Sequence, residues 1–338
     1  MLDTFTTILL TGGTGSFGTA MTSYLLAYTD ATIRIYSRGE ALRAEMQERF
    51  RAQQDRLRFF AGDVRDEQRL RDALTGVNLV IHCAALKRIE MGEYDPMEFI
   101  KTNVMGTFNV MRACRQAGVN RALFLSTDKA VSPINVYGSS KALGERLWAQ
   151  GNAYAPDSTE LVAVRYGNVS GSRGSVIPLW RQCLVEGKPL PVTDLGMSRF
   201  YISMDEAVEA AIFAITHAPR GSIIVPHLPA YLMGDLAEAV MENSGRDHAS
   251  MEYIGLRAGE KWHEMLVSEE EATRLLEYTG ESAMRYYCIP ARSPSWTTES
   301  GGRLVSPWQA VFLPAPYESQ WWPDRLSVPQ LRERLEGV

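Results

Sequence analysis

The sequence of 338 residues is 45% hydrophobic and 22% charged, with a formal net charge of -5. This composition is typical of an ordinary folded globular protein and argues against long disordered spans. The 35 basic residues are mixed with 40 acidic residues and form no basic tract, so we expect no nucleic-acid partner.

Nothing near the start of the sequence resembles an export signal. Met1 is followed by neither a basic region nor a small-residue cleavage pattern, and no run reaches the roughly 18 apolar residues of a membrane span. The four cysteines, Cys83, Cys114, Cys183 and Cys288, are widely spaced and show no metal-ligand pairing. Such spacing is typical of reduced thiols in a cytosolic protein. We therefore expect a cytoplasmic protein without a membrane partner or a metal site.

The N-terminal segment has the pattern of a dinucleotide-binding unit. An apolar strand over 7–10 is followed by Thr-Gly-Gly-Thr-Gly-Ser-Phe-Gly at 11–18 and then by a helical segment over 19–27. The glycines fit both G-x-G-x-x-G and G-x-x-G-x-x-G. A strand, a glycine turn and a helix in this order place a pyrophosphate at the helix N-terminus, although a purely structural glycine turn has the same form. We expect cofactor contacts from Gly12, Thr14, Gly15, Ser16, Phe17 and Gly18.

The second strand indicates which dinucleotide binds. The strand over 32–36 is followed by Ser37 and Arg38, where proteins that bind NAD carry an acidic residue for the ribose 2′-hydroxyl. Without a carboxylate, Ser37 and Arg38 suit a 2′-phosphate, which favours NADP. The alternative is that Arg38 is a solvated loop charge, and NAD then fits as well.

Further strands alternate with helices. Apolar strands are predicted over 57–61 and 78–83, and helical apolar spacing covers 66–74 and 96–117. This alternation indicates an α/β fold with a doubly wound parallel sheet, whose ligands collect at the carboxyl edge of the strands. Lys87 at that edge suits a phosphate or a sugar, with plain surface charge as the alternative. We expect cofactor contacts at these strand ends from Asp63, Val64, Ala84 and Lys87.

A strand over 122–125 brings the candidate catalytic residues to the same edge. Tyr137 and Lys141 follow at the start of a predicted helix, where a spacing of four puts both side chains on one face. A nearby ammonium lowers the pKa of a phenol, so we expect an acidified Tyr137. The predicted catalytic residues are Thr127, Asp128, Lys129, Tyr137 and Lys141, of which Tyr137 and Lys141 also contact the cofactor.

The second half of the chain contains a predicted substrate-binding lobe. A strand over 161–166 leads into a loop at 167–178 that has more glycines and polar donors than a connection needs. Arg173, Arg199 and Arg257 suit a diphosphate and a sugar, with surface salt bridges as the alternative. The glutamates at 264 and 269–271 are interpreted as a solvated acidic face.

These elements predict a doubly wound parallel Rossmann sheet with a smaller C-terminal substrate-binding lobe. The NADP-binding domain covers 1–167 with returning segments at about 200–226, the lobe covers 168–199 and 227–290, and a tail covers 291–338. The tail contains Trp296, Trp308, Trp321 and Trp322. We expect it to pack on the lobe or to form a subunit contact.

Four motifs carry a resemblance to a known family. They are Ser-Thr-Asp-Lys-Ala at 126–130, Arg-Tyr-Gly-Asn-Val at 165–169, Gly-Ser-Arg-Gly-Ser-Val at 171–176 and Gly-Glu-Lys-x-His-Glu at 259–264. With these motifs the chain resembles the extended short-chain dehydrogenase/reductases that act on nucleotide sugars, and more narrowly the inverting UDP-N-acetylglucosamine 4,6-dehydratases of the polysaccharide-biosynthesis group. Retaining dehydratases typically carry Thr-Asp-Glu where this chain has Thr127-Asp128-Lys129.

The resemblance implies an intramolecular redox dehydration. Bound NADP+ takes a hydride from carbon 4 of the sugar and returns it to carbon 6, while Tyr137, helped by Thr127 and Lys141, takes the 4-hydroxyl proton. Lys129 removes the proton on carbon 5 as a neutral amine, and a protonated Asp128 assists loss of the 6-hydroxyl. We expect burial and nearby positive charge to lower the pKa of Lys129.

The resemblance also implies a UDP-sugar substrate and a homo-oligomer. Substrate contacts are expected from Lys87, Asn168, Arg173, Val176, Thr193, Arg199, Arg257 and Glu260. A nucleotide-sugar 4-epimerase, a retaining dehydratase and a 5,6-dehydratase use the same scaffold and are the nearest alternatives. A non-catalytic NADP-binding regulator is a more distant one, because such proteins commonly lack an intact Tyr-x-x-x-Lys.

Overall fold

A ten-stranded sheet forms the centre of the protein, in a computed structural model that describes residues 2–154, 159–246, 249–291, 306–313 and 316–336. In order across the sheet, the parallel strands are β3 (Leu57–Ala61), β2 (Thr32–Ser37), β1 (Thr7–Thr11), β4 (Leu79–His82), β5 (Arg121–Leu125), β6 (Glu160–Val164) and β10 (Ile223–Pro226). The predicted doubly wound parallel sheet is therefore confirmed.

The sheet continues beyond β10 with antiparallel strands from the C-terminal part of the chain. These are β15 (Tyr286–Ile289), β14 (Leu276–Tyr278) and β16 (Trp308–Ala310). The predicted lobe and tail thus both contribute strands to the main sheet.

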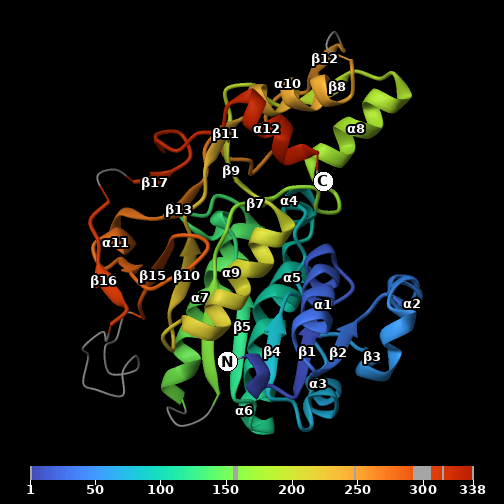
Figure 1. The fold of residues 1–338 in the computed structure, drawn as a ribbon, viewed down its shortest axis with the longest axis vertical. Helices are drawn as coiled ribbons and strands as arrows, with labels where there is room; N and C mark the ends of the chain where they lie inside the picture. Colours follow the sequence, from blue (N-terminus) through green and yellow to red (C-terminus); the bar gives the residue numbers. More distant parts are fainter. Residues whose placement is uncertain (1, 155–158, 247–248, 292–305, 314–315, 337–338) are drawn as a thin grey trace.

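Helices cover both faces of the sheet (Figure 1). Along β1, Ile8 and Leu10 enter one hydrophobic core and Leu9 enters the other, because successive side chains of a strand point to opposite faces. The first core contains residues of α1 (Ser16–Tyr28) and α9 (Met204–His217). The second contains residues of α3 (Glu67–Leu74), α6 (Gly106–Ala117) and α7 (Val136–Tyr154).

The sheet has its topological switch point at β1. This strand pairs with β2 on one side and with β4 on the other, so the chain winds away from it in both directions. In sheets of this type ligands bind beyond the carboxyl ends of the strands at the switch point. The glycine turn that follows β1 lies at this position.

Helical segments differ from the sequence prediction in several places. The sequence did not predict α2 (Glu40–Arg49), α4 (Ile89–Tyr94) or α8 (Val176–Glu186). The predicted helix over 96–117 is divided into α5 (Pro96–Phe99), the π-helix η3 (Ile100–Met105) and α6. The sequence did not predict α9, which begins with a capping box in which Ser203 and Glu206 satisfy each other's backbone N–H groups. The remaining helices of this half are η1 (Leu2–Thr4) and η2 (Arg51–Arg56).

A smaller lobe lies above the carboxyl edge of the sheet (Figure 1). Its own core contains Trp180, Leu236 and Leu331, each fully buried. It is built from α8 (Val176–Glu186), β8 (Leu190–Val192), α10 (Met233–Asn243), β12 (Met251–Tyr253) and α12 (Val328–Leu335). The connecting strands are β7 (Asn168–Val169), β9 (Ser198–Ile202) and β11 (Ala230–Leu232), followed by β13 (Met265–Val267), α11 (Glu269–Ala272) and β17 (Tyr317–Glu318).

The described parts of the tail pack within the chain. Helix α12 contacts α10, β17 pairs with β13, and Trp308 and Trp322 are buried. Trp321 is exposed, and Trp296 lies outside the described residues. Within the described ranges, no helix has both the length and the apolar character needed to cross a membrane.

Candidate active site

The glycine turn fits a dinucleotide pyrophosphate. Gly12 has a φ of +65°, and a Cβ there would lie 2.8 Å from the backbone of Ala84, so only glycine fits. A Cβ on Gly18 would lie 2.5 Å from Gly13. Because glycine has no Cβ, α1 can start close against the turn. Gly15 precedes α1 and provides no capping side chain. Among the described residues, a Cβ on Gly15 would meet only the Gly12 carbonyl within 4 Å, which leaves space beside the start of α1 that suits a phosphate.

Residues at the ends of β2 and β3 form the predicted adenosine end of this site. The hydroxyl of Ser37 is buried and has no hydrogen-bond partner among the described residues. Arg38 lies 3.7 Å from the Asp63 carboxylate, which also binds Arg65 at 2.7 Å. Partial burial acts to raise the pKa of Asp63, but the hydrogen bonds and charge of Arg65 lower it overall. Val64 is buried in the core.

A loop from the second half of the chain reaches the glycine turn. The backbone N–H of Arg173 donates to Ser16 Oγ at 3.1 Å, and Lys87 Nζ donates to the Arg173 carbonyl at 3.0 Å. Burial lowers the pKa of Lys87, as does the charge of Arg173. The predicted cofactor turn and the predicted substrate loop are thus in direct contact.

Helix α7 places Tyr137 and Lys141 at the end of β5. Asn135 caps the helix, because its Oδ1 accepts a hydrogen bond from the Gly138 N–H at 2.6 Å. Lys141 donates to the carbonyl of Leu125 and lies 4.0 Å from the centroid of the Phe124 ring. Burial lowers the pKa of Lys141 to about 8.

The predicted acidification of Tyr137 is wrong for this structure. Burial raises the pKa of its phenol, and the cation that opposes this shift is Lys129, while a hydrogen bond with Thr127 also opposes it. The sequence assigned that role to Lys141 because of the spacing on the helix. Lys141 instead points at the end of strand β5, through its hydrogen bond to Leu125.

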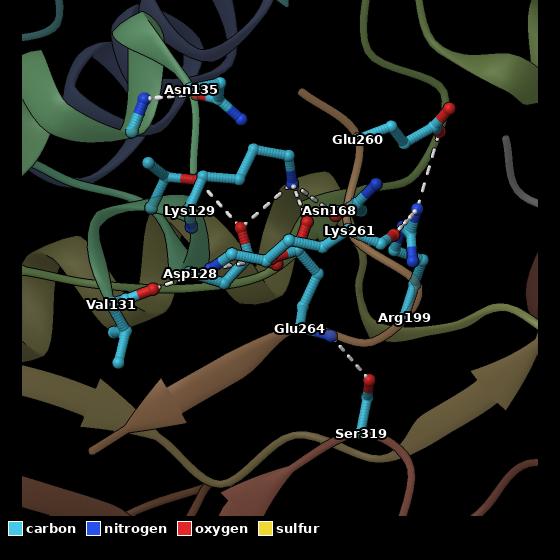
Figure 2. Close-up of polar contacts among 12 residues, drawn as sticks. Asp128, Lys129, Val131, Asn135, Asn168, Arg199, Glu260, Lys261, Glu264 and Ser319 are labelled. Carbon is cyan, nitrogen blue, oxygen red and sulfur yellow. Dashed lines mark hydrogen bonds and ion pairs between the residues drawn. The ribbon is translucent and has the colours of Figure 1, made fainter. Parts of the chain in front are cut away.

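Asp128 and Lys129 lie in a one-turn 3-10 helix, η4 (Asp128–Ala130), directly after β5. Asp128 is fully buried, and its Oδ1 accepts from Thr127 Oγ1 at 2.8 Å and from Lys129 Nζ at 3.0 Å. Lys129 Nζ also lies 3.2 Å from Asn168 Oδ1 and 3.1 Å from Glu264 Oε1 (Figure 2). The structure therefore brings the predicted acid and base together with one predicted substrate residue.

The pKa of Lys129 differs from the prediction. Burial acts to lower it, as expected, but the negative charges of Asp128 and Glu264 outweigh burial and raise it. The sequence did not predict the second carboxylate beside the amine. Lys129 is consequently an ammonium ion in this arrangement.

Glu264 is the carboxylate beside Lys129 that the sequence interpretation missed. It is 1% exposed, whereas Glu269 and Glu270 are exposed as predicted. Glu271 is also not solvated, because it forms an ion pair with the buried Arg165. The available signal was the motif at 259–264, which ends at Glu264 just before β13.

The predicted arginines differ in what they contact. Arg199 is 5% exposed and donates to the carbonyls of Ser198, Lys261 and Trp262, which fixes the loop before β13. Arg257 is half-exposed and forms a two-point pair with Glu260, at 3.0 and 2.8 Å. Arg173 is exposed. Of these three arginines, Arg173 and Arg257 are exposed, and Arg257 also pairs with Glu90 at 3.1 Å.

Two further predicted substrate residues lie in the lobe. Val176 is the first residue of α8 and packs against the lobe core, and Thr193 is half-buried directly after β8. Neither is among the residues that contact Lys129.

A cavity of about 710 Å³ borders the η4 turn and helix α7. Its lining includes Ala130, Ala142, Arg165 and Glu271, and none of the predicted catalytic residues. The cavity therefore adjoins the segments that carry Lys129 and Lys141 without including either side chain.

Comparison with known proteins identifies the family of this chain. The chain matches the family described as Polysaccharide biosynthesis protein over residues 8–285. It is 43% identical over 291 residues to a UDP-N-acetylglucosamine 4,6-dehydratase (inverting) of Campylobacter jejuni, an alignment that covers 85% of this chain and 83% of that protein. It is 42% identical over 289 residues to a UDP-glucose 4-epimerase of Rickettsia typhi, covering 84% and 82%. The X-ray structure of Pen from Bacillus thuringiensis has a TM-score of 0.89 and 31% identity, covering 100% of both chains. The resemblance drawn from the sequence is thus confirmed, and the chain belongs to the polysaccharide biosynthesis protein family of extended short-chain dehydrogenase/reductases.

Proposed function

We propose that this protein catalyses the NADP-dependent dehydration of UDP-N-acetylglucosamine to a UDP-4-keto-6-deoxy sugar, with inversion at carbon 5. The observation that carries this proposal is the buried pair of Asp128 and Lys129, whose charged atoms lie 3.0 Å apart at the end of β5. Oxidation at carbon 4 needs only the Tyr137 and Lys141 machinery. An additional amine and carboxylate suit removal of the carbon 5 proton and departure of the 6-hydroxyl. The identity to the Campylobacter jejuni dehydratase supports this assignment.

A nicotinamide dinucleotide fits the glycine turn. The open space at Gly15 suits the pyrophosphate, and the unpartnered Ser37 hydroxyl with the exposed Arg38 suits a 2′-phosphate. When bound, the nicotinamide supplies a hydride acceptor for carbon 4 and returns the hydride to carbon 6. Tyr137 takes the proton of the 4-hydroxyl, and Thr127 hydrogen-bonds the same oxygen.

The raised pKa of Lys129 is compatible with its role as a base. One proton transfer from Lys129 Nζ to Asp128 Oδ1 turns the ion pair into a neutral amine and a carboxylic acid, without any change in the number of protons that the pair holds. The amine then takes the proton on carbon 5, next to the carbon 4 ketone. The acid gives its proton to the 6-hydroxyl, which leaves as water. The electron pair left on carbon 5 then forms a double bond between carbons 5 and 6.

The substrate nucleotide is assigned to the carboxyl edge of the sheet, where the lobe lies above it (Figure 1). Arg173 and Arg257 are the exposed members of the three predicted substrate arginines and suit the diphosphate. Asn168 connects Lys129 to this face. Lys87, Val176, Thr193, Arg199 and Glu260 complete the proposed set, with Arg199 shaping the loop through the backbone contacts described above.

The test is incubation of the purified protein with UDP-N-acetylglucosamine and NADP+ in heavy water, followed by NMR of the sugar. We expect a 4-keto-6-deoxy product that carries deuterium at carbon 5 and has the inverted configuration there. A product with carbon 5 unchanged, or no deoxygenation at carbon 6, would overturn the proposal.

The second candidate is a nucleotide-sugar 4-epimerase. The 42% identity to the Rickettsia typhi epimerase favours it, and an epimerase would use the same Tyr137 and Lys141. It has no use for an acid and a base beyond them. The same NMR experiment separates the two, because an epimerase inverts carbon 4 and retains the 6-hydroxyl.

A further inference from the structure

The amine of Lys129 is held by three acceptors, two of which come from distant parts of the chain. Asp128 on η4, Asn168 on β7 and Glu264 just before β13 each place an oxygen 3.0 to 3.2 Å from Nζ (Figure 2). An ammonium has three N–H donors, and these three oxygens match that number. The position of Nζ is therefore fixed from three sides, and one of these is the previously unassigned carboxylate of Glu264.

Glu264 is a charged group in an environment that disfavours charge. Its side chain is 2% exposed, and its Oε2 has no hydrogen-bond partner among the described residues. Lys261 Nζ lies 3.7 Å from Oε2 and donates a hydrogen bond to the Val131 carbonyl at 2.6 Å. A buried carboxylate with one oxygen left without a hydrogen bond adds little to stability. Its placement against Lys129 points to a role in the reaction.

We propose that Glu264 is a positioning residue for the dehydration: its carboxylate holds the Lys129 amine beside Asp128 and keeps one proton in the Asp128–Lys129 pair. This inference rests on the proposed function, because only the dehydration needs an acid and a base at these positions. Glu264 acts through Lys129 and does not itself touch the reacting atoms.

The charges around the Asp128–Lys129 pair determine the pH dependence that this role predicts. Asp128 and Glu264 are negative, whereas Lys129, Lys261 and Arg199 are positive, and the phenol of Tyr137 lies close by. The pair works with one proton: with none it has no acid, and with two it has no base. A negative charge 3.1 Å from Nζ makes every proton harder to remove from the pair. Both limbs of the pH–rate profile therefore lie at higher pH when Glu264 is ionised than when it is absent.

The experiment compares pH profiles of kcat for dehydration in the wild type and in matched variants. Glu264→Gln keeps the size and a hydrogen-bond acceptor but removes the charge, and both limbs should move to lower pH by about one to two units. Lys261→Met removes the opposing positive charge, so both limbs should move to higher pH. Glu269→Gln removes an exposed glutamate of the same segment and should leave the profile unchanged.

Each outcome is decisive. Opposite shifts in Glu264→Gln and Lys261→Met support the proposal, since a purely structural residue changes the amount of active enzyme and not its pH profile. A Glu264→Gln profile that is scaled down but parallel to the wild type overturns it. If Glu264→Gln does not fold, the test uses two other variants. Glu264→Asp should retain both limbs of the wild-type pH profile, and Lys261→Met supports the proposal only if its limbs move to higher pH. If the wild-type protein forms no 4-keto-6-deoxy product, the proposed function is wrong. The proposed role of Glu264 then has no basis either.

Discussion

The Nζ atom of Lys129 lies 3.0 Å from Oδ1 of Asp128, its neighbour in the sequence. Adjacent residues of a strand point to opposite faces, so this contact depends on the turn of 3-10 helix that follows β5. The turn places an amine and a carboxylate where one proton can move between them. A generic oxidation site thereby gains an acid and a base.

Removing the amine tests the assigned base. Lys129→Ala should lower kcat for dehydration by roughly a thousandfold, as expected for loss of a general base, while the Kd for UDP changes by less than about threefold. Product NMR and isothermal titration calorimetry measure the two quantities. Lys188→Ala, at a lysine that is 67% exposed, serves as the control and should match the wild type. Full dehydratase activity in Lys129→Ala would refute the assignment of the base.

Removing the phenol tests the first step separately. Tyr137→Phe should slow oxidation at carbon 4, because no side chain then takes the 4-hydroxyl proton, and kcat should fall by roughly a thousandfold. Single-turnover absorbance of the reduced nicotinamide measures this step before dehydration. Tyr94→Phe, at a tyrosine that is 87% exposed, is the matched control. A normal absorbance rise in Tyr137→Phe would show that another residue is the base for carbon 4.

The sequence predicted the parallel strands of the sheet because local patterns determine them, but it did not predict the antiparallel strands β14, β15 and β16. Each parallel strand is an apolar run with a polar turn at its end, and Ile8, Leu9 and Leu10 are buried because helices cover both faces. Local pattern could not distinguish Glu264 from Glu269, since both lie in the same glutamate-rich stretch. Their burial differs because one reaches Lys129 through a contact between distant segments. The direction of the pKa shift of Lys129 was missed for the same reason.

Cofactor choice can be tested at the end of β2. Arg38→Ala should weaken NADP+ binding about tenfold and leave NAD+ binding within about twofold, because only NADP+ presents a 2′-phosphate to the guanidinium. Quenching of tryptophan fluorescence during titration with each dinucleotide gives both Kd values. Arg51→Ala removes an arginine that is 76% exposed and controls for a general loss of positive charge. Equal weakening of both dinucleotides would show that Arg38 does not read the 2′-phosphate.

Acid stability should depend on the ion pair between Arg165 and Glu271. Both guanidinium Nη atoms of the buried Arg165 lie 2.8 Å from Glu271 oxygens. Burial acts to raise the pKa of Glu271, but Arg165 lowers it to about 2. A carboxyl group whose pKa is lower in the folded than in the unfolded protein stabilises the fold above its unfolded pKa of about 4.3, and this stabilisation is lost as the pH falls toward 2.

Glu271→Gln should therefore lower the free energy of unfolding by about 2 to 3 kcal/mol at neutral pH. The difference from the wild type should shrink between about pH 4 and pH 2, where the wild-type carboxylate also becomes neutral. Urea unfolding at a series of pH values measures it, with Glu269→Gln as an exposed neighbour that should follow the wild type at every pH. Arg165 directly follows β6, and Glu271 lies on α11, beside the segment that carries Glu264. If the difference in unfolding free energy between the variant and the wild type stays constant with pH, Arg165 does not stabilise the charged form of Glu271. The attachment of this segment to the sheet would then depend on apolar packing alone.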